Sequence, residues 1–269
     1  MPATAVQPAK WNAADYAANS VVHQTWAREL IARRKLRGHE HLLDVGCGDG
    51  KVTAEIARAL PGGSATGVDA SAEMIAFARK TFPARKNPNL TFHVRDARKA
   101  GFDHQFDLIF SNAALHWVDD HEAFLRGAAA VLRRGGRLVV SCGGQGNGQA
   151  VAAALHAVMR RKRWRDSFRR MPRPYFFYAP ADYQLWLKRA KFLPQSVALA
   201  PKDAVYDGAA GLAAWLRTAW LPYTQRVPEA ERGEFIRAVA ERYCATHPPD
   251  GQGRVLVRMV RLEIDALKA

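Results

Sequence analysis

The sequence predicts an α/β protein built on a doubly wound, seven-stranded and mostly parallel sheet. Short apolar runs alternate with helical patterns over the first half of the chain, which is typical of repeated strand–helix units. A glycine-rich turn separates the first apolar run from the helical pattern after it, and two more strand patterns follow late in the chain. The expected strands cover residues 41–46, 65–69, 90–94, 106–111, 137–141, 195–206 and 255–267.

Helices are expected before the first strand and between the later ones. Ser71 is a suitable N-cap, because its hydroxyl can accept a hydrogen bond from a free backbone N–H. Gly135 and Gly136 are expected to end a helix, since glycine often follows the last helical residue. The expected helices cover residues 11–34, 51–60, 72–82, 121–133, 151–159, 183–191, 211–221 and 229–246.

The composition is that of a globular protein, because 48% of the 269 residues are hydrophobic and can form a sizeable core. No apolar run reaches the length of a membrane span, and the N-terminus lacks a signal-peptide pattern. Cys47, Cys142 and Cys244 are few and far apart, so no disulfide framework is expected. These features predict a cytoplasmic protein.

The formal net charge of +15 can indicate a nucleic-acid or anionic partner. The basic residues are spread along the whole chain, however, which favours an ordinary solvated surface. Residues 160–173 interleave cations with Trp164 and Phe168, a pattern that suits either nucleic-acid stacking or a solvated connection. The solvated connection is preferred, and a nucleic-acid partner is the less favoured interpretation.

The glycine-rich turn is the most informative stretch of the sequence. Asp44 ends the first apolar run, and Gly46, Gly48 and Gly50 follow as GxGxG, one residue shorter than a dinucleotide fingerprint. A carboxylate so close to the glycines would repel a pyrophosphate but attract an amino group or a sulfonium. Asp69 ends the next apolar run, where an acceptor for a ribose diol is expected.

Residues 42–140 resemble the class I S-adenosylmethionine-dependent methyltransferases, because four of that family's motifs occur in order. These are the turn 44–50, the ribose acid Asp69, the adenine-side acid Asp96 and the post-strand segment 106–113. The resemblance implies S-adenosyl-L-methionine as the cofactor, S-adenosyl-L-homocysteine as its product, and no metal. The residues it implies for cofactor binding are Asp44, Gly46, Cys47, Gly48, Gly50, Asp69, Ala70, Met74, Asp96, Ala97, Ser111 and Asn112.

The resemblance also assigns separate parts of the cofactor to these residues. Asp44 and the backbone of the glycine turn would hold the amino-acid end, and Asp69 would accept hydrogen bonds from the ribose hydroxyls. Asp96 would accept one from the adenine amine, and the N–H of Ala97 would donate one to an adenine nitrogen. Met74 would pack against the adenine, although a methionine at helical spacing is more often plain core.

The N-terminal helical pattern carries Tyr16, Ser20 and Gln24 at intervals of four, which would place them on one helix face. One interpretation is a solvated polar stripe. The segment also resembles the lid of small-molecule methyltransferases related to the trans-aconitate and juvenile-hormone-acid methyltransferases, in which such a stripe faces the active site. That resemblance implies that Tyr16 and Gln24 contact the substrate.

His116 and Trp117 follow the fourth strand, where these relatives carry an aromatic or His-Trp element beside the methyl acceptor. A carboxylate acceptor is already ionised at neutral pH and needs hydrogen-bond donors, such as Gln24, Trp117, His116 and an arginine. A hydroxyl or thiol acceptor would instead need a base, for which His116 is the candidate. The alternative is that both residues only pack the start of the next helix.

The expected organisation is one methyltransferase domain over residues 1–269. Its core covers about 38–150, the N-terminal lid about 11–35, and helical cap insertions about 151–192 and 208–248. Trp215 lies in the second insertion and is expected to contact the substrate, by resemblance to the caps of the same relatives. Nine histidines are scattered without the paired spacing of a metal site.

The resulting prediction is an S-adenosylmethionine-dependent methyltransferase of a small and anionic molecule, with O-methylation of a carboxylate as the first choice. N- or C-methylation of a small metabolite and methylation of a nucleic acid or protein are the alternatives. A non-catalytic cofactor-binding subunit is a third class. No Asn/Asp-Pro-Pro-Tyr motif, which is associated with amino-methylating nucleic-acid enzymes, follows the fourth strand.

Overall fold

A computed structural model describes residues 11–269 with the exception of 20, 100 and 104. The chain divides into two compact units, which are described separately. The sheet unit comprises Asn12–Gln145, Tyr175–Ala200 and Arg261–Ala269. The described part of the helical unit comprises Trp11, Gly146–Pro174 and Pro201–Val260.

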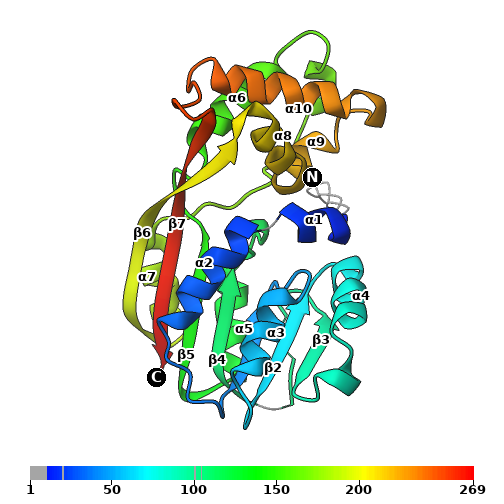
Figure 1. The fold of residues 1–269 in the computed structure, drawn as a ribbon. Coiled ribbons are helices and arrows are strands. Elements are labelled where there is room, and N and C mark those ends of the chain that lie inside the picture. The colour runs from blue at the N-terminus through cyan, green and yellow to red at the C-terminus, as the bar shows by residue number, and fades with distance from the viewer. Residues whose placement is uncertain (1–10, 20, 100, 104) are drawn as a thin grey trace. The chain divides into compact units, whose positions relative to one another are not determined.

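The seven strands form one sheet in the order β3-β2-β1-β4-β5-β7-β6 (Figure 1). The pairs from β3 to β5 are parallel, and β7 runs antiparallel to β5. This topology confirms the predicted doubly wound, mostly parallel α/β fold. The strands are β1 His41–Val45, β2 Ser64–Asp69, β3 Leu90–Val94, β4 Phe106–Asn112, β5 Leu132–Gly143, β6 Phe192–Asp207 and β7 Arg254–Lys268.

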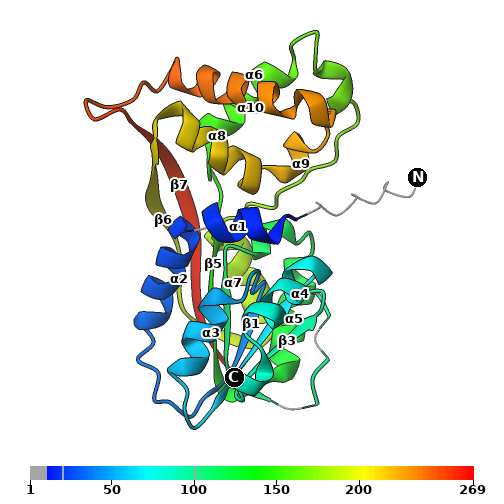
Figure 2. The same ribbon diagram turned by 45° about the vertical axis from the view of Figure 1, so that its right-hand side comes forward.

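Each face of the sheet has its own hydrophobic core, because successive strand residues point to opposite faces. Leu42 packs with α2 (Val21–Ala32), α3 (Lys51–Arg58) and α4 (Ala72–Thr81). Leu43 and Val45 pack on the other face with α5 (His121–Val131) and α7 (Pro180–Arg189). Figures 1 and 2 show the two helical layers on either side of the sheet.

The strand order reverses at β1, which lies between β2 and β4. In open α/β sheets, ligands bind outside the carboxyl ends of the strands at such a switch point. The loops that follow β1, β2 and β4 therefore define where the site is expected. A short 3₁₀ helix, η2 (Leu115–Trp117), follows β4 at this edge, and another, η1 (Ala84–Lys86), precedes β3.

The N-terminal segment forms two helices, α1 (Ala13–Asn19) and α2, which run in different directions (Figure 2). Tyr16 is on α1 and Gln24 is on α2, so the prediction that they share one face of a single helix is wrong. Ser20, the third residue of that predicted stripe, lies outside the described residues. The regular spacing in the sequence contains no signal for the change of direction.

Gly135 and Gly136 do not end α5, contrary to the sequence-based expectation. The helix ends at Val131, and β5 begins at Leu132, which pairs with Phe106 of β4. The register then shifts, so that the next paired residue of β5 is Arg137. The glycine pair lies in this bulge, and Gly135 adopts a φ of 72°, which suits glycine.

The helical unit contains α6 (Gln149–Met159), η3 (Arg165–Phe168), α8 (Gly208–Ala219), α9 (Leu221–Thr224) and α10 (Glu229–Cys244). Trp164 and Phe168 of the basic segment pack edge-on and tilted against Phe235 of α10, with ring centroids 5.4 Å apart in both pairs. Arg163 is ion-paired with Glu231 and Glu234 of the same helix. Among the described residues, no helix is long and apolar enough to cross a membrane.

Candidate active site

The turn after β1 is a tight backbone cradle. Gly46, Gly48 and Gly50 all adopt positive φ angles, between 54° and 81°, which other residues rarely tolerate. A Cβ on Gly46 would lie 2.1 Å from the Cβ of Ala114 in the loop after β4, so only glycine fits against that loop. The N–H groups of Gly46 and Cys47 both donate to Val68 O, at 2.7 and 3.0 Å.

Asp69 at the end of β2 is fixed by two backbone donors. Its Oδ2 accepts the N–H of Gly48 at 3.0 Å, and its Oδ1 accepts the N–H of Ser71 at 2.8 Å. Burial raises the pKa of the carboxyl, while these two hydrogen bonds act in the opposite direction. Ser71 is the N-cap of α4, as predicted, with its Oγ accepting the N–H of Met74 at 3.2 Å.

Two further buried carboxylates lie beside the glycine turn. Asp44 is 3% exposed and accepts a 2.6 Å hydrogen bond from the hydroxyl of Thr53. Burial raises its pKa to about 7, and the charges of Asp69 and Asp49 add to the rise. Asp49, which sequence reasoning did not single out, has a buried Oδ2 without a hydrogen bond, 3.6 Å from Lys51 Nζ. The turn thus gathers three carboxyl groups whose ionised forms a bound cation would stabilise.

Tyr16 of α1 lies against this turn. A Cβ on Gly48 would be 3.6 Å from its Cε1 atom. Burial raises the pKa of Tyr16, and so do Asp49, Asp69 and Asp44, whereas Arg261 lowers it. Lys51 holds α1 over the turn by donating to the Ala17 carbonyl at 2.8 Å. Tyr16 is therefore close enough to the carboxylates of the turn and to the Arg261 cation to feel both charges.

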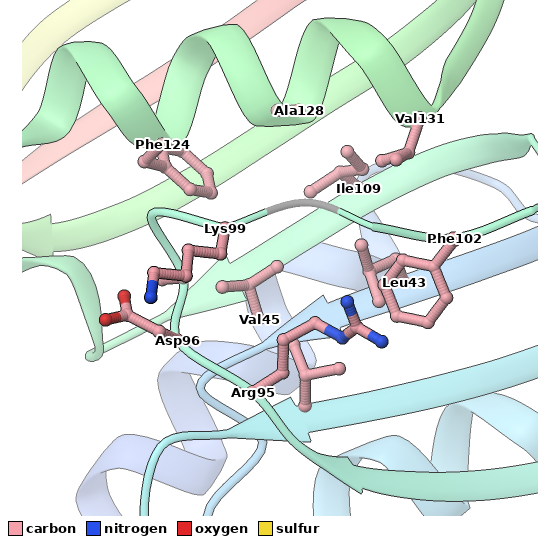
Figure 3. A pocket seen from close by; sticks show the side chains of 12 residues that line it. Leu43, Val45, Arg95, Asp96, Lys99, Phe102, Ile109, Phe124, Ala128 and Val131 are labelled. Atoms are coloured by element: carbon pink, nitrogen blue, oxygen red, sulfur yellow. The ribbon is translucent and has the colours of Figure 1, made fainter.

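Asp96 and Ala97 follow β3 and line a pocket beside α5 (Figure 3). Asp96 already has a partner, because Arg98 Nε lies 3.0 and 3.1 Å from its two carboxylate oxygens. This ion pair lowers the pKa of Asp96. The deeper wall is apolar and comes from β1, β4 and α5, and the Arg95 guanidinium lies 4.5 Å from the Phe102 ring centroid.

The end of β4 is tied to its neighbours by side-chain hydrogen bonds. Ser111 is fully buried and donates to Val45 O at 2.7 Å. The amide of Asn112 donates to His23 O of α2 at 3.0 Å, and its Oδ1 accepts from Arg261 Nη2 at 3.2 Å. Ala113 has a φ of 57°, an uncommon conformation for a residue other than glycine. Ser111 and Asn112 thus position the loop through their side chains.

His116 and Trp117 lie on η2, next to the aromatic side chains of 175–177. The Trp117 ring is 4.9 Å from that of Tyr175 in an edge-on arrangement, and the His116 ring is 6.0 Å from that of Phe177. The Nδ1 atom of His116 accepts the N–H of Gly143 at 3.3 Å, which places any proton of the neutral ring on Nε2. Burial and the Arg261 charge hold the pKa of His116 well below its usual value.

Arg261 of β7 is the functional candidate that sequence reasoning missed. It is 2% exposed, and its guanidinium donates to the side chains of Ser141 (3.1 Å) and Asn112 and to the Ser141 carbonyl (2.5 Å). In β7 it continues the alternating positions of Val255, Val257 and Met259, which are all buried. The sequence signal that could have identified Arg261 is its place in this alternation, because it falls on the same face of the strand as three core residues.

The remaining predicted site residues occupy different settings. Ala70 is exposed after β2, and Met74 is 2% exposed in α4, packed as core. Cys47 is buried, and burial together with the nearby carboxylates raises its pKa. Gln24 is half-buried on α2. Trp215 belongs to the helical unit, where its ring lies 5.3 Å from that of Tyr206. The structure does not test the cofactor or substrate contacts predicted for these five residues.

The site suits a ligand that carries positive charge at one end and hydroxyls in the middle. Three carboxylates lie at the glycine turn, two of them buried, with Lys51 as the nearby cation, so a sulfonium or ammonium would reduce their repulsion. The Asp69 carboxylate is held rigidly by backbone N–H groups and keeps lone pairs for a diol. These features fit an S-adenosylmethionine-type cofactor better than a dinucleotide.

Comparison with known proteins agrees with this geometry. A family described as a methyltransferase domain matches residues 43–140. An uncharacterized methyltransferase of Schizosaccharomyces pombe, C70.08c, is 31% identical over 192 residues, which cover 68% of this chain and 70% of that protein. The trans-aconitate 2-methyltransferase of Rhodopseudomonas palustris strain BisB5 is 26% identical over 275 residues, which cover 97% of this chain and all of that protein.

Solved structures show the same fold. The YcgJ protein from Bacillus subtilis superposes with a TM-score of 0.64 at 18% identity, covering 91% of this chain and 99% of that one. Magnesium protoporphyrin IX methyltransferase from Synechocystis PCC 6803, solved with bound S-adenosylhomocysteine, gives 0.54 at 15% identity, covering 95% and 86%. The chain belongs to the class I S-adenosylmethionine-dependent methyltransferases and resembles the trans-aconitate 2-methyltransferases among them.

Proposed function

We propose that this methyltransferase transfers a methyl group to a carboxylate oxygen of a small anionic acid. The main support for this proposal is that the two sides of the site, the glycine turn and the region around Arg261, carry opposite charges. Three carboxylates, two of them buried, lie at the glycine turn, whereas the buried Arg261 cation is bonded to Asn112 and Ser141 at the ends of β4 and β5, near His116. The family's cofactor is cationic, so the negative side suits the donor and the positive side suits an anionic acceptor. The full-length similarity to trans-aconitate 2-methyltransferases also favours a carboxylate.

On the donor side, we assign the roles that the sequence suggested. Asp44 and the backbone of the glycine turn hold the amino-acid end, and Asp69 accepts hydrogen bonds from the ribose hydroxyls. Bound there, S-adenosylmethionine supplies a methyl group that is already activated by its sulfonium. The protein's main contribution is then to hold the acceptor in line and to exclude water. The adenine is assigned to Asp96, Ala97 and Met74, with Asp96 also paired to Arg98.

On the acceptor side, the geometry favours hydrogen-bond donors over a base. A carboxylate is ionised at neutral pH and gives up no proton when it attacks the methyl group. The lowered pKa of His116 makes it a weak base, and its Nδ1 is occupied by the Gly143 N–H, which leaves Nε2–H as a donor. We assign Trp117, Gln24 and Tyr16 to the same acceptor wall.

Cofactor affinity should rise as the pH rises, because Asp44 must lose a proton to attract a cation. Its pKa is about 7 in the ligand-free protein, so the carboxyl is mostly protonated at about pH 5.5 and mostly charged at about pH 7.5. A bound ammonium or sulfonium favours the charged form, so binding releases a proton at low pH. We expect the Kd for S-adenosylhomocysteine to fall about tenfold over this range.

Isothermal titration calorimetry in buffers of different ionisation enthalpy would measure both the affinity and the released proton. Burial also raises the pKa values of Asp49 and Asp69, so protonation of either carboxyl would change the affinity in the same direction. His23 and His116 stay neutral in this range because burial lowers their pKa values. An Asp44→Asn variant should flatten the profile, and an unchanged profile in that variant would rule out Asp44 as the titrating group.

The proposed function is tested by methyl transfer from radiolabelled S-adenosylmethionine to a panel of carboxylic acids, amines, phenols and RNA. We expect label to appear in a base-labile methyl ester of one of the acids. Label that resists base treatment would indicate N-methylation, C-methylation or a phenolic methyl ether, and label in RNA would indicate a nucleic-acid substrate. Either result would overturn the proposal.

A further inference from the structure

Arg261 is a buried cation for which the fold provides no counter-ion. Its Nε and Nη2 donate only to neutral oxygens of Ser141 and Asn112, and the Trp26 ring centroid lies 5.2 Å from its guanidinium carbon. Among the described residues, no carboxylate lies within ion-pair distance of the guanidinium. Glu263, whose charge it feels, is itself paired with Arg33 at 2.9 Å.

Burial of an unpaired charge is strongly unfavourable, and a bound anion would remove this penalty. Desolvation lowers the pKa of Arg261 to about 10, which still leaves it charged at neutral pH. Its Nη1 donates to no described residue, so two N–H groups of the guanidinium remain for a ligand. A guanidinium in this state matches a carboxylate in both charge and geometry.

His23 supplies a second polar group beside the arginine. Its Nδ1 is buried and has no hydrogen-bond partner among the described residues. Burial and the Arg261 charge lower the pKa of His23 to about 4, so the ring is neutral and carries one N–H donor. The backbone of His23 is fixed by Asn112, the same residue that binds Arg261. The two side chains therefore border one polar site at the ends of β4 and β5.

We infer that Arg261, assisted by His23, binds an anionic group of the acceptor other than the oxygen that is methylated. This inference rests on the proposed function and deepens it, because it assigns acceptor specificity to one side chain. An acceptor that carries at least two carboxylates would satisfy the arginine with one and present the other to the methyl group.

The reacting carboxylate itself is a poor partner for Arg261. Its charge disappears as the ester forms, so an arginine bound to it would stabilise the ground state more than the transition state. The carboxylate of the methyl donor is the other candidate. Arg261 is held by Asn112 and Ser141 at the ends of β4 and β5, and it lies opposite Gly143, whose N–H donates to His116. Asp44 and Asp69 lie on β1 and β2, on the opposite side of β4 from β5 and β7. We therefore assign Arg261 to the acceptor side.

The test is calorimetric binding of tricarballylate, a tricarboxylate probe, to the intact protein loaded with S-adenosylhomocysteine. We expect Arg261→Met to weaken tricarballylate binding by about 30-fold or more, in line with the loss of a charge-assisted pair. His23→Asn should weaken tricarballylate binding by about fivefold. This variant tests the inference even if Arg261→Met does not fold. S-Adenosylhomocysteine should bind both variants as tightly as it binds the wild type.

Arg137→Met is the matched control, since Arg137 lies on the neighbouring strand and has its own partner, Asp265, at 2.6 Å. It should leave tricarballylate binding unchanged. Absent binding in the wild type, unchanged binding in Arg261→Met, or weaker binding of S-adenosylhomocysteine to it would each overturn the inference. If tricarballylate binds through Arg261 but no acid is methylated, the proposed function fails and the anion site stands. If acids are methylated equally well by Arg261→Met, the site fails and the function stands.

Discussion

An Asp69→Ala variant should bind S-adenosylhomocysteine about 100-fold more weakly than the wild type, as measured by isothermal titration calorimetry. The carboxylate is assigned to both ribose hydroxyls, and hydrogen bonds to a charged acceptor contribute about 1.5–3 kcal/mol each. The substitution also removes the acceptor for the N–H groups of Gly48 and Ser71, which hold the glycine turn and the start of α4 in place. Both effects act on the cofactor, so the affinity should fall steeply.

Two further variants separate these effects. Asp69→Asn keeps one oxygen for the backbone and removes the charge, so it should recover part of the affinity. Asp107→Ala is the matched control, because Asp107 is also a carboxylate that accepts a strand N–H, from His41 at 2.6 Å. It should lower the unfolding temperature without changing the Kd. An unchanged Kd for Asp69→Ala, or an equal loss in Asp107→Ala, would contradict the ribose assignment.

The sheet was predictable because parallel strands that are buried on both faces appear in the sequence as continuous runs of apolar residues. β4 is an example, with a buried residue at nearly every position from Phe106 to Ser111. The glycine turn was predictable for a different reason, since its backbone conformation restricts the residue type. Both constraints are local, so the residue types in the sequence reveal them. They place Asp44 at the end of β1, where the structure also has it, beside Asp69 at the end of β2.

The features that sequence reasoning missed depend on packing between distant segments. Gly135 and Gly136 are compatible with either a helix end or a bulge, and the pairing of Phe106 with Leu132 decides for the bulge. The bidentate contact of Arg98 with Asp96 is local, but the sequence does not distinguish it from solvent exposure. Arg261 reaches the site only because β7 pairs antiparallel with β5, which sets Arg261 opposite Gly143.

Trp117→Ala should lower kcat about 100-fold with the best acceptor of the panel, while the Kd for S-adenosylhomocysteine stays within about twofold. Trp117 lies on η2 at the end of β4, and its ring packs edge-on against Tyr175 beside His116. Its indole N–H is assigned as a donor to the acceptor, so its loss removes both a contact and the shape that holds the acceptor in line. The cofactor residues on β1 and β2 are untouched.

Trp117→Phe separates the two contributions, because it keeps an aromatic ring against Tyr175 and removes the N–H. A kcat close to that of Trp117→Ala would identify the hydrogen bond as the main contribution, and a kcat near the wild type would identify packing. Trp186→Ala is the control, since Trp186 on α7 has its ring 4.7 Å from that of Tyr178 and packs against the core formed by α5 and α7 on one face of the sheet. It should reduce stability alone. A parallel loss of cofactor affinity in Trp117→Ala would place Trp117 in the donor site, because a residue confined to the acceptor wall has no contact through which to weaken binding of the product cofactor.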